Sequence, residues 1–520
     1  MTTFDAVVVG SGAGGAPLAC ALCEAGYRVL LIERGREVKR ADFDRDEIEW
    51  CRRDGFVPSP HNDPHMWRSD VNTPAYKTAD GWISTLLGGG TMHMAAYLLR
   101  ADEADARQGT RLAHEAGSQA LDWAVPFADV ARYYDEIERA LGVSQALKTH
   151  ALAHKLDRAA TALGIPTMPT PRGILTSPQD GRLACDYREQ CASYGCPTGA
   201  RASMPTTYIP RAQRTGNLTL WTHAMCRKVE RGAVHVLHHG VNEVVPAKII
   251  VVACGAVESA RLLLLSGMGG ARHPSVGKHL WFSLCAELSG FFAAEAHGDV
   301  DELMAGSPFL NRSVHHGAHL DDQARARTGL DRSGMFEASF VHENPIHRAE
   351  RVAFESEPGN ILVGTALKRA LAKAFHGGRT VILEGFAESV PHAGAFVDLD
   401  PHVVDPHGLP VARITHAHHA RNLRVCDAQI DEGKALLAEM GAVDIRVTRA
   451  PSMTLALQGG TCRFGTDPST SATDPEGRIH GEPDLYVADG ASMPSSLACP
   501  TTLTLIANSL RIAAGIIKRG

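Results

Sequence analysis

An ordered strand, glycine-rich turn, helix and second strand at the start of the chain constrain its fold more than any other feature. The apolar run DAVVVG leads into a turn with Gly10, Gly12 and Gly15, and the second strand, YRVLLIE, ends at Glu33. Gly10 permits a tight turn, Gly12 lets the backbone approach a pyrophosphate, and Gly15 lets the helix pack close to the strand. The pyrophosphate would lie on amides at the helix N-terminus, and Glu33 stands where a carboxylate binds ribose hydroxyls. The segment predicts a dinucleotide-binding βαβ unit, without deciding between FAD and NAD.

The composition is that of a globular protein of more than one domain. The 520 residues are too many for one ordinary core, and the hydrophobic and charged fractions are 44% and 21%. A net charge of −6 indicates no basic surface for nucleic acid or anionic lipid. The 12 cysteines are scattered, which favours reduced thiols over disulfides. We see no secretory signal and no apolar run long enough to span a membrane, so we expect a cytoplasmic protein.

Several further segments resemble the glucose–methanol–choline (GMC) oxidoreductases, a family of FAD enzymes. They are LLGGGTMHMAAYLLR at 86–100, KIIVVACGAVESARLLLLSG at 248–267, GTCRFG at 460–465 and the C-terminal run at 478–511. The run DWAVPFADVARYYDEIERALGV at 122–143 belongs to the same series. The order and separation of these segments are similar to those of the family, nearest to its sugar and gluconate dehydrogenases. The resemblance implies an FAD-dependent enzyme acting on CH–OH or CH–CH donors.

The resemblance also implies a two-domain α/β fold. It consists of a discontinuous Rossmann-type FAD-binding domain, residues 1–275 and 455–520, and an α+β substrate domain, residues 276–454, built on an antiparallel sheet. The strands expected in that sheet include VILEGFAESV at 381–390 and AFVDLDPH at 395–402, and residues 419–441 have the pattern of an amphipathic helix. The residues expected to bind FAD are Gly10, Gly12, Gly14, Gly15, Glu33, Arg34, Gly88, Gly89, Gly90, Thr91, His93, Cys226, Gly255, Ser259, Asp489, Gly490, Thr501 and Thr502.

Two of these positions have a specific expected role. In some family members a histidine at the position of His93 is covalently attached to the flavin, and the alternative here is a histidine packed against it. The last helix, which begins near Thr501, would direct its N-terminal amides at the flavin and stabilise charge on the reduced ring.

The positions that usually carry the family's catalytic pair hold residues that cannot accept a proton. Counting back from the glycine of GTCR places Leu457 where a histidine is usual, and Pro500 stands where an asparagine or histidine is usual. The neighbours Gln458 and Cys499 are the candidate catalytic residues, although glutamine is not a base and Cys499 is more typical of a small buried residue. A base raises the rate of alcohol oxidation by roughly 10²–10⁴, so its absence bears on the reaction and not on the cofactor.

Three explanations of the missing pair stay open. A base could come from the histidine clusters His315, His316 and His319 or His416, His418 and His419, which we otherwise expect at the surface. The substrate could need no strong base. The flavin could also serve a lyase or isomerase without net redox turnover.

Three of the cysteines, at 185, 191 and 196, are clustered in one segment. Sugar-oxidising relatives carry a cysteine-rich insertion here, with a further cysteine that would fall on Arg188. An iron–sulfur cluster or zinc is an alternative, and a loop of reduced thiols is the preferred interpretation. We therefore predict hydride transfer from a small alcohol, sugar or cyclic ketone to flavin N5, and on to oxygen, a quinone or a carrier protein.

Overall fold

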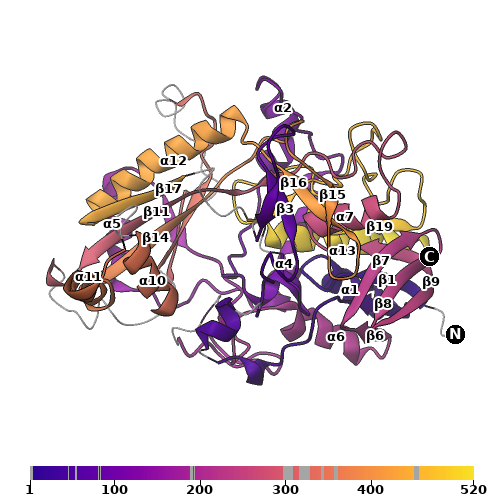
Figure 1. Ribbon diagram of the computed structural model, residues 1–520, viewed down its shortest axis with the longest axis horizontal. Helices are drawn as coiled ribbons and strands as arrows, with labels where there is room; N and C mark the ends of the chain where they lie inside the picture. The colour runs from indigo at the N-terminus through magenta and orange to yellow at the C-terminus, as the bar shows by residue number, and fades with distance from the viewer. Residues whose placement is uncertain are drawn as a thin grey trace.

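A computed structural model describes residues 4–44, 46–52, 55–79, 81, 83–187, 191, 194–296, 309–315, 328–340, 345–355, 361–449 and 456–520. In this part of the chain no helix is both long and apolar enough to cross a membrane. Figure 1 shows the nucleotide-binding end on the right, where both chain termini lie, and a second sheet with its helices on the left.

The predicted βαβ unit forms the centre of a seven-stranded sheet. Strand β1 (Phe4–Val9) pairs in parallel with β2 (Val29–Ile32) and β9 (Val241–Val252), and helix α1 (Gly15–Glu24) connects the first two. The order is β6-β2-β1-β9-β8-β7, and β19 also pairs with β9. The remaining strands are β6 (Leu218–Trp221), β7 (Ala224–Glu230), β8 (Ala233–His238) and β19 (Leu485–Val487).

Helices cover this sheet because its central strands are apolar on both faces. Helix α1 packs against α6 (Tyr208–Arg214) and against the C-terminal helix α13 (Thr502–Arg519). Helix α7 (Ala256–Leu265) follows β9 and packs against a four-stranded sheet of order β15-β16-β3-β4. Those strands are β15 (Phe396–Val404), β16 (Pro410–Thr415), β3 (His65–Arg68) and β4 (Tyr76–Thr78).

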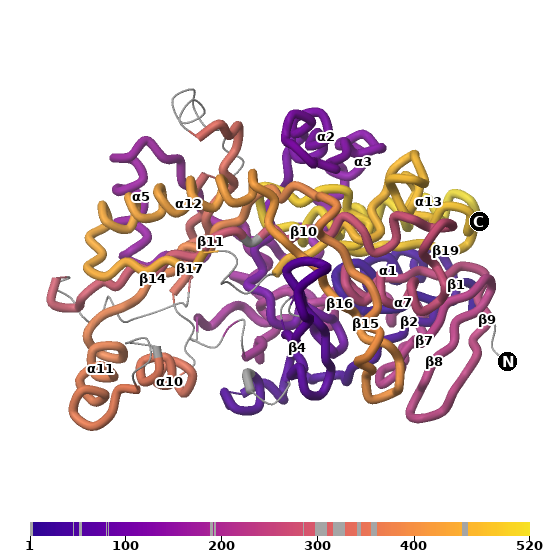
Figure 2. The backbone as a smooth tube through the Cα atoms, turned by 45° about the horizontal axis from the view of Figure 1, so that its top comes forward, coloured from indigo at the N-terminus to yellow at the C-terminus, as the bar shows by residue number. Residues whose placement is uncertain are grey.

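The second large sheet is antiparallel and has six strands in the order β17-β11-β14-β13-β12-β5. One face packs on helices α12 (Ala420–Glu439) and α5 (Ala151–Ala162), and Figure 2 shows α10 (Pro345–Glu355) and α11 (Gly364–His376) on the other side. The strands are β17 (Asp444–Arg449), β11 (Leu284–Ala293), β14 (Gly378–Phe386), β13 (Met335–Phe340), β12 (Phe309–Val314) and β5 (Thr167–Pro169).

Short elements complete the chain. A two-stranded ribbon joins β10 (Trp281–Phe282) to β18 (Gln458–Gly459). The short helices are α2 (Gln108–Arg111), α3 (Phe127–Ala131), α4 (Tyr134–Leu141), the π-helix η2 (Ile48–Arg52) and the 3₁₀ turns η1 (Arg40–Asp42), η3 (Gly89–Met92), η4 (Glu103–Arg107), η6 (Met204–Thr206), η7 (Ala294–Ala296) and η8 (Gly490–Ser492).

The structure confirms the α/β fold with an antiparallel second sheet and the predicted helix at 419–441, and it corrects two details. Residues 381–386 lie in the six-stranded sheet, whereas 396–404 lie in the four-stranded sheet against α7. The cluster expected at the surface is largely inside, since His416 and His419 are buried, with His416 among aromatic rings. His315 pairs with Glu432 on α12, and His316 and His319 lie outside the described residues.

Candidate active site

A large cavity runs from the glycine turn after β1 to the open face of the six-stranded sheet. Its volume is about 1330 Å³, more than the roughly 300–1,000 Å³ typical of a pocket for one small ligand. It therefore has room for a dinucleotide and a substrate. Of the predicted cofactor residues, the wall includes Gly10, Gly12, Gly14, Glu33, Arg34, Gly89, Gly90, Thr91, His93, Cys226, Gly255, Asp489, Gly490, Thr501 and Thr502.

The glycines of the first turn differ in what a side chain would meet there. A Cβ on Gly14 would lie 2.0 Å from the Ala488 carbonyl oxygen, and one on Gly15 would lie 1.9 Å from the Gly10 oxygen. Gly10 itself has a φ of +103°. On Gly12 the nearest atom would be the Gly88 oxygen at 4.0 Å. No atom of the described protein would clash with a Cβ at Gly12, so the fold itself does not require glycine there. This is expected where the backbone approaches a pyrophosphate.

Glu33 is fixed by the turn that it faces. Its carboxylate accepts hydrogen bonds from Ser11 Oγ at 2.6 Å and from the Gly35 amide at 2.9 Å. Ser11 Oγ in turn accepts the Gly88 amide at 2.9 Å, so the glycine-rich loop is held against the first turn. Burial raises the pKa of Glu33, against the hydrogen bonds from Ser11 and Gly35.

Asp489 also holds backbone turns together, at the opposite edge of the cavity. Its carboxylate accepts hydrogen bonds from the Gly255 amide at 2.7 Å, the Ser259 hydroxyl at 2.6 Å and the Ala491 amide at 2.8 Å. These bonds join the turn between β9 and α7 to the turn after β19. Ser259 itself is buried behind the wall, where its hydroxyl donates to Asp489 and accepts the Cys254 amide at 2.9 Å.

The loop at 88–93 and the start of α13 border the cavity from two more sides. Thr91 Oγ1 donates to the Gly88 oxygen at 2.7 Å and accepts the Met204 amide at 3.1 Å. His93 Nε2 lies 2.6 Å from Ser84 Oγ, and burial together with Arg201 lowers the pKa of His93 to about 4, so the ring is neutral at pH 7. Pro500, Thr501 and Thr502 place the first turn of α13 at the wall, where helix amides favour negative charge.

The candidate catalytic residues lie in different surroundings. Leu457 and Gln458 both line the cavity; Leu457 has a φ of +57°, and Gln458 Nε2 donates to the Gly81 oxygen at 2.7 Å. Pro500 also lines it, whereas Cys499 does not. The Cys499 sulfur is buried 3.9 Å from the Arg100 oxygen, and burial raises the pKa of its thiol well above the usual value.

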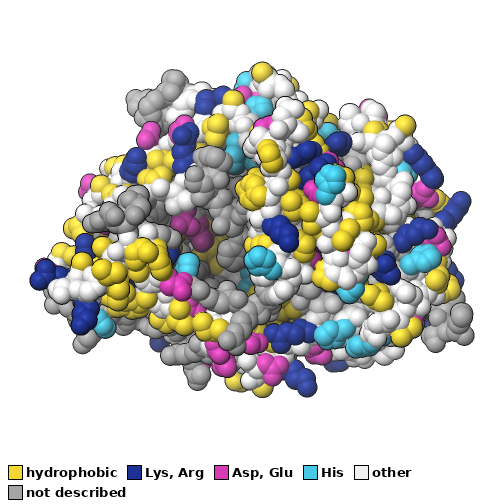
Figure 3. All heavy atoms as spheres, viewed as in Figure 1, with side chains coloured by type: hydrophobic (Ala, Val, Ile, Leu, Met, Phe, Trp, Pro, Cys, Tyr) yellow, Lys and Arg dark blue, Asp and Glu magenta, His cyan; other side chains and the backbone are white. Residues whose placement is uncertain are grey.

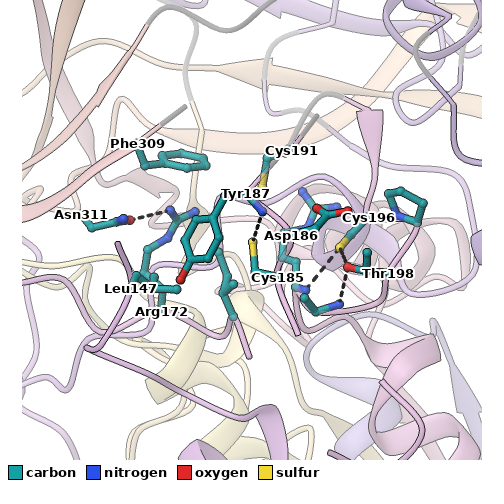
Figure 4. A pocket seen from close by; sticks show the side chains of 14 residues that line it. Leu147, Arg172, Cys185, Asp186, Tyr187, Cys191, Cys196, Thr198, Phe309 and Asn311 are labelled. Carbon is teal, nitrogen blue, oxygen red and sulfur yellow. Dashed lines mark hydrogen bonds between the residues drawn. The ribbon is translucent and has the colours of Figure 1, made fainter. Parts of the chain in front are cut away.

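The three clustered cysteines border a separate, small cavity (Figure 4). The Cys185 sulfur accepts the Tyr187 amide at 3.4 Å, and the Cys196 sulfur accepts the Arg201 amide at 3.4 Å. Burial raises the pKa of Cys185 to about 11, which disfavours the thiolate. Among the residues described here, no three histidine, cysteine or acidic side chains are grouped to hold a metal, and Arg188 lies outside that part of the chain.

Sequence reasoning missed the acidic side chains on the far wall. Glu287 on β11 and Glu384 on β14 are paired in register and both line the cavity, together with Tyr97 and Phe386. The alternation V-I-L-E-G-F that predicted strand β14 was the available signal, because side chains two residues apart share a face. The sequence alone could not say that this face borders the cavity.

The geometry defines a dinucleotide-dependent enzyme with its reaction chamber between a Rossmann-type sheet and an antiparallel sheet. The residues present fit FAD, because the Gly12 cradle and the carboxylate of Glu33 face one cavity that also reaches the start of α13. Two GMC oxidoreductase family models match the chain, at residues 21–285 and 391–509. The chain belongs to the GMC oxidoreductase family and is an FAD-dependent oxidoreductase.

Individual relatives are similar over nearly the whole chain. Paromamine 6'-oxidase from Streptomyces fradiae is 29% identical, covering 99% of this chain and 91% of its own length. A 2-methyl-1,2-propanediol dehydrogenase from Mycolicibacterium austroafricanum is 26% identical over 99% of this chain and 95% of its own. The crystal structure of a pyridoxine 4-oxidase from Mesorbium loti aligns with a TM-score of 0.63 at 17% identity, covering 99% of both chains. These comparisons favour an oxidase or dehydrogenase over the lyase alternative.

Proposed function

We propose that this enzyme oxidises a hydroxyl-bearing carbon of a small polar molecule, bound where the cofactor cavity reaches the six-stranded sheet. The observation that carries the proposal is the continuity of one cavity from Gly10 to Glu384. Bound FAD would supply the hydride acceptor for this reaction. The relatives named above, an oxidase of paromamine and a dehydrogenase of a diol, support a substrate of this kind.

In this proposal one group of residues binds the cofactor and another contacts the substrate. Glu33 and the Gly12 turn hold the nucleotide part of FAD, and Asp489 keeps the turns around it in place. Gln458 uses Nε2 for Gly81, which leaves its Oε1 to accept a hydrogen bond from the substrate hydroxyl. We assign no proton transfer to Cys499, because its buried sulfur faces Arg100 and not the cavity.

The hydroxyl proton needs an acceptor at the substrate end of the cavity. Leu457 and Pro500 have no basic atom. At the substrate end the titratable wall residues include Glu287 and Glu384. A pH–rate profile of Gln variants on a neutral alcohol decides whether either takes the proton, since a general base moves the rising limb of that profile.

Other assignments stay predictions. They are the division into residues 1–275 with 455–520 and residues 276–454, a cytoplasmic location, and oxygen, a quinone or a carrier protein as electron acceptor. A covalent bond through His93 is tested by acid precipitation, because a covalently held flavin stays with the denatured protein. Iron and zinc analysis of the purified enzyme tests the metal alternative at Cys185, Cys191 and Cys196.

The function is tested by anaerobic reduction of the purified enzyme. Absorbance of the oxidised flavin is recorded during titration with diols, simple alcohols, neutral sugars, amino sugars and cyclic ketones. We expect the flavin to be bleached by hydroxyl-bearing compounds and the carbonyl product to appear in equal amount. If dithionite reduces the flavin but no alcohol or sugar does so, the proposal is overturned.

A further inference from the structure

A row of three carboxylates crosses neighbouring strands of the six-stranded sheet, and two of them, Glu287 and Glu384, line the far wall of the cavity. Glu287 on β11 pairs in register with Glu384 on β14, and Glu384 pairs with Glu337 on β13. Thr448 on β17 and Ser313 on β12 continue the row on either side. Directly opposed strand residues have Cβ atoms about 4.5–5.5 Å apart, and like charges so placed repel. Glu287, Glu384 and Glu337 therefore place three acidic groups in one line across the sheet.

The residues next to the row in sequence point to the opposite face and form an ordinary core. Leu288, Leu383 and Ala338 pack with Leu436 and Leu437 of α12. The glutamates therefore occupy the one face of this sheet that borders the cavity. Figure 3 shows acidic side chains beside a hollow near the middle of the visible face.

No salt bridge neutralises the row within the described part of the chain. Glu337 is fully buried and accepts hydrogen bonds from Ser313 Oγ at 2.6 Å and Thr170 Oγ1 at 3.0 Å. Arg172 lies near enough to lower the pKa values of Glu337 and Glu384, but its guanidinium donates to Asn311 and to the Ala95 oxygen.

The remaining charged groups around the row do not offset the effect of burial on its pKa values. Arg351 on α10 faces Glu287 and lowers its pKa, although burial has the larger, opposite effect. Burial and the neighbouring Glu287 raise the pKa of Glu384 to about 7, and burial raises that of Glu337 to about 8. The row thus retains protons that a bound cation would displace.

A second, independent feature directs a ligand to the same place. The side chain of Tyr97 lines the cavity and is 8% exposed. Its hydroxyl lies toward Glu384, yet no atom of the described protein completes a well-formed hydrogen bond with it. A buried hydroxyl whose contact with Glu384 is poorly formed costs free energy, and a polar ligand group in the cavity would provide a better partner.

We propose that Glu287, Glu384 and Tyr97 form a subsite for a protonated amine, so that the substrate is an alcohol that also carries an ammonium group. This inference rests on the function proposed above, because it places the substrate at the same end of the cavity. An organic cation fits better than a metal ion, since no three ligand side chains of the described residues are grouped to coordinate one. Charged hydrogen bonds to carboxylates are short and strong, and Tyr97 can accept a further N–H.

Isothermal titration of the FAD-loaded enzyme with two matched pairs of compounds tests the subsite. Glucosamine is compared with N-acetylglucosamine, and 3-amino-1-propanol with 1,3-propanediol, at pH 7, where both amines are mainly protonated. We expect at least one amine to bind about ten-fold or more tightly than its neutral partner, the gain of a hydrogen bond between charged groups. In Glu384→Gln and Glu287→Gln this preference should fall by about ten-fold, whereas Glu439→Gln, at an exposed position on α12, should retain it.

Separate readouts distinguish this inference from the proposed function. Anaerobic flavin reduction reports oxidation, whereas calorimetry reports amine binding in the same samples. Absence of an amine preference in the wild-type enzyme overturns the subsite even if neutral alcohols reduce the flavin. The subsite is also overturned if Glu384→Gln lowers kcat for 1,3-propanediol and leaves amine affinity unchanged, because Glu384 would then act as a base.

Discussion

At the scale of single residues, the site depends on positions where a side chain is absent or unreactive. Gly12 and Gly15 belong to one turn, yet only Gly15 is confined by the fold. Leu457 and Pro500 lie in the wall of the cavity, where the family's catalytic pair was expected by counting along the sequence. Sequence spacing was sufficient to locate the glycine turn and the positions of Leu457 and Pro500, because each depends on a short stretch of chain.

Substitution of the two glycines should separate folding from cofactor binding. In Gly15→Ala the new Cβ meets the Gly10 oxygen at 1.9 Å, so we expect loss of soluble protein or a large drop in thermal stability. In Gly12→Ala the nearest atom is 4.0 Å away, so we expect a folded protein with little bound FAD. Circular dichroism melts and the ratio of flavin to protein absorbance measure the two effects. Full flavin content in Gly12→Ala would contradict the assignment of this turn.

Leu457→His should supply the base that the family usually has at this position. Histidine tolerates the positive φ of 57° better than leucine, and the site faces the cavity. We expect kcat for a neutral alcohol to rise by roughly ten-fold or more, within the 10²–10⁴ range of general bases. The pH–rate profile should gain a limb of histidine character. Leu457→Gln is the matched control, since it adds polarity without a base, and an equal rise there would exclude proton transfer as the cause.

At the scale of elements, buried ion pairs fasten segments from distant parts of the chain around the start of α13. Arg332 lies 3.2 Å from both Asp105 and Glu388, and 2.8 Å from Asp102. Asp105 also accepts the Ala498 amide at 2.9 Å, two residues before Pro500. No sequence pattern indicated this cluster, because Arg332 lies 227 residues from Asp105 and 56 from Glu388 and pairs with them only through tertiary packing.

Removal of Arg332 should therefore destabilise the protein strongly. Arg332→Met leaves Asp105 buried without its cationic partner, whereas Glu388 keeps Arg111 and Arg421. Loss of a buried partner of this kind costs about 3–5 kcal/mol. Urea unfolding with excess FAD measures the loss. Arg446→Met removes an exposed pair with Asp444 and should change the free energy of unfolding by less than about 1 kcal/mol. Equal effects of the two substitutions would show that burial of the cluster contributes nothing.

At the scale of the whole molecule, the retained protons of the acidic row couple stability to pH. The pKa values of Glu384 and Glu337 are about 7 and 8 in the folded protein, above those of glutamate in an unfolded chain. The folded state therefore binds more protons than the unfolded state at every pH between the glutamate pKa of the unfolded chain and the raised pKa values of Glu384 and Glu337. The stability that this provides is present at lower pH and is lost as pH rises through about 7 to 8. The buried His93, whose pKa is about 4, titrates below this window.

We expect the free energy of unfolding to fall from pH 6.5 to pH 8.5. Each retained proton contributes a slope of about 1.4 kcal/mol per pH unit. Glu337→Gln should flatten the slope by nearly one proton, because the amide does not titrate. Its oxygen can still accept from Ser313 Oγ, and its NH2 group can donate to Thr170 Oγ1. Urea titrations with excess FAD at several pH values measure the slope. A free energy that is constant or rises over this range would show that the row is already ionised.

The sequence by itself determined the nucleotide-binding unit, the cofactor class, the family and the α/β architecture with an antiparallel second sheet. These follow from contiguous motifs in which each residue acts on its near neighbours. Only the tertiary structure decided that Cys499 faces away from the cavity, that His416 and His419 are buried, and that Glu287, Glu337 and Glu384 stand in one row. The reason is that strand register and helix coverage depend on pairing between segments far apart in the chain, which local pattern does not specify.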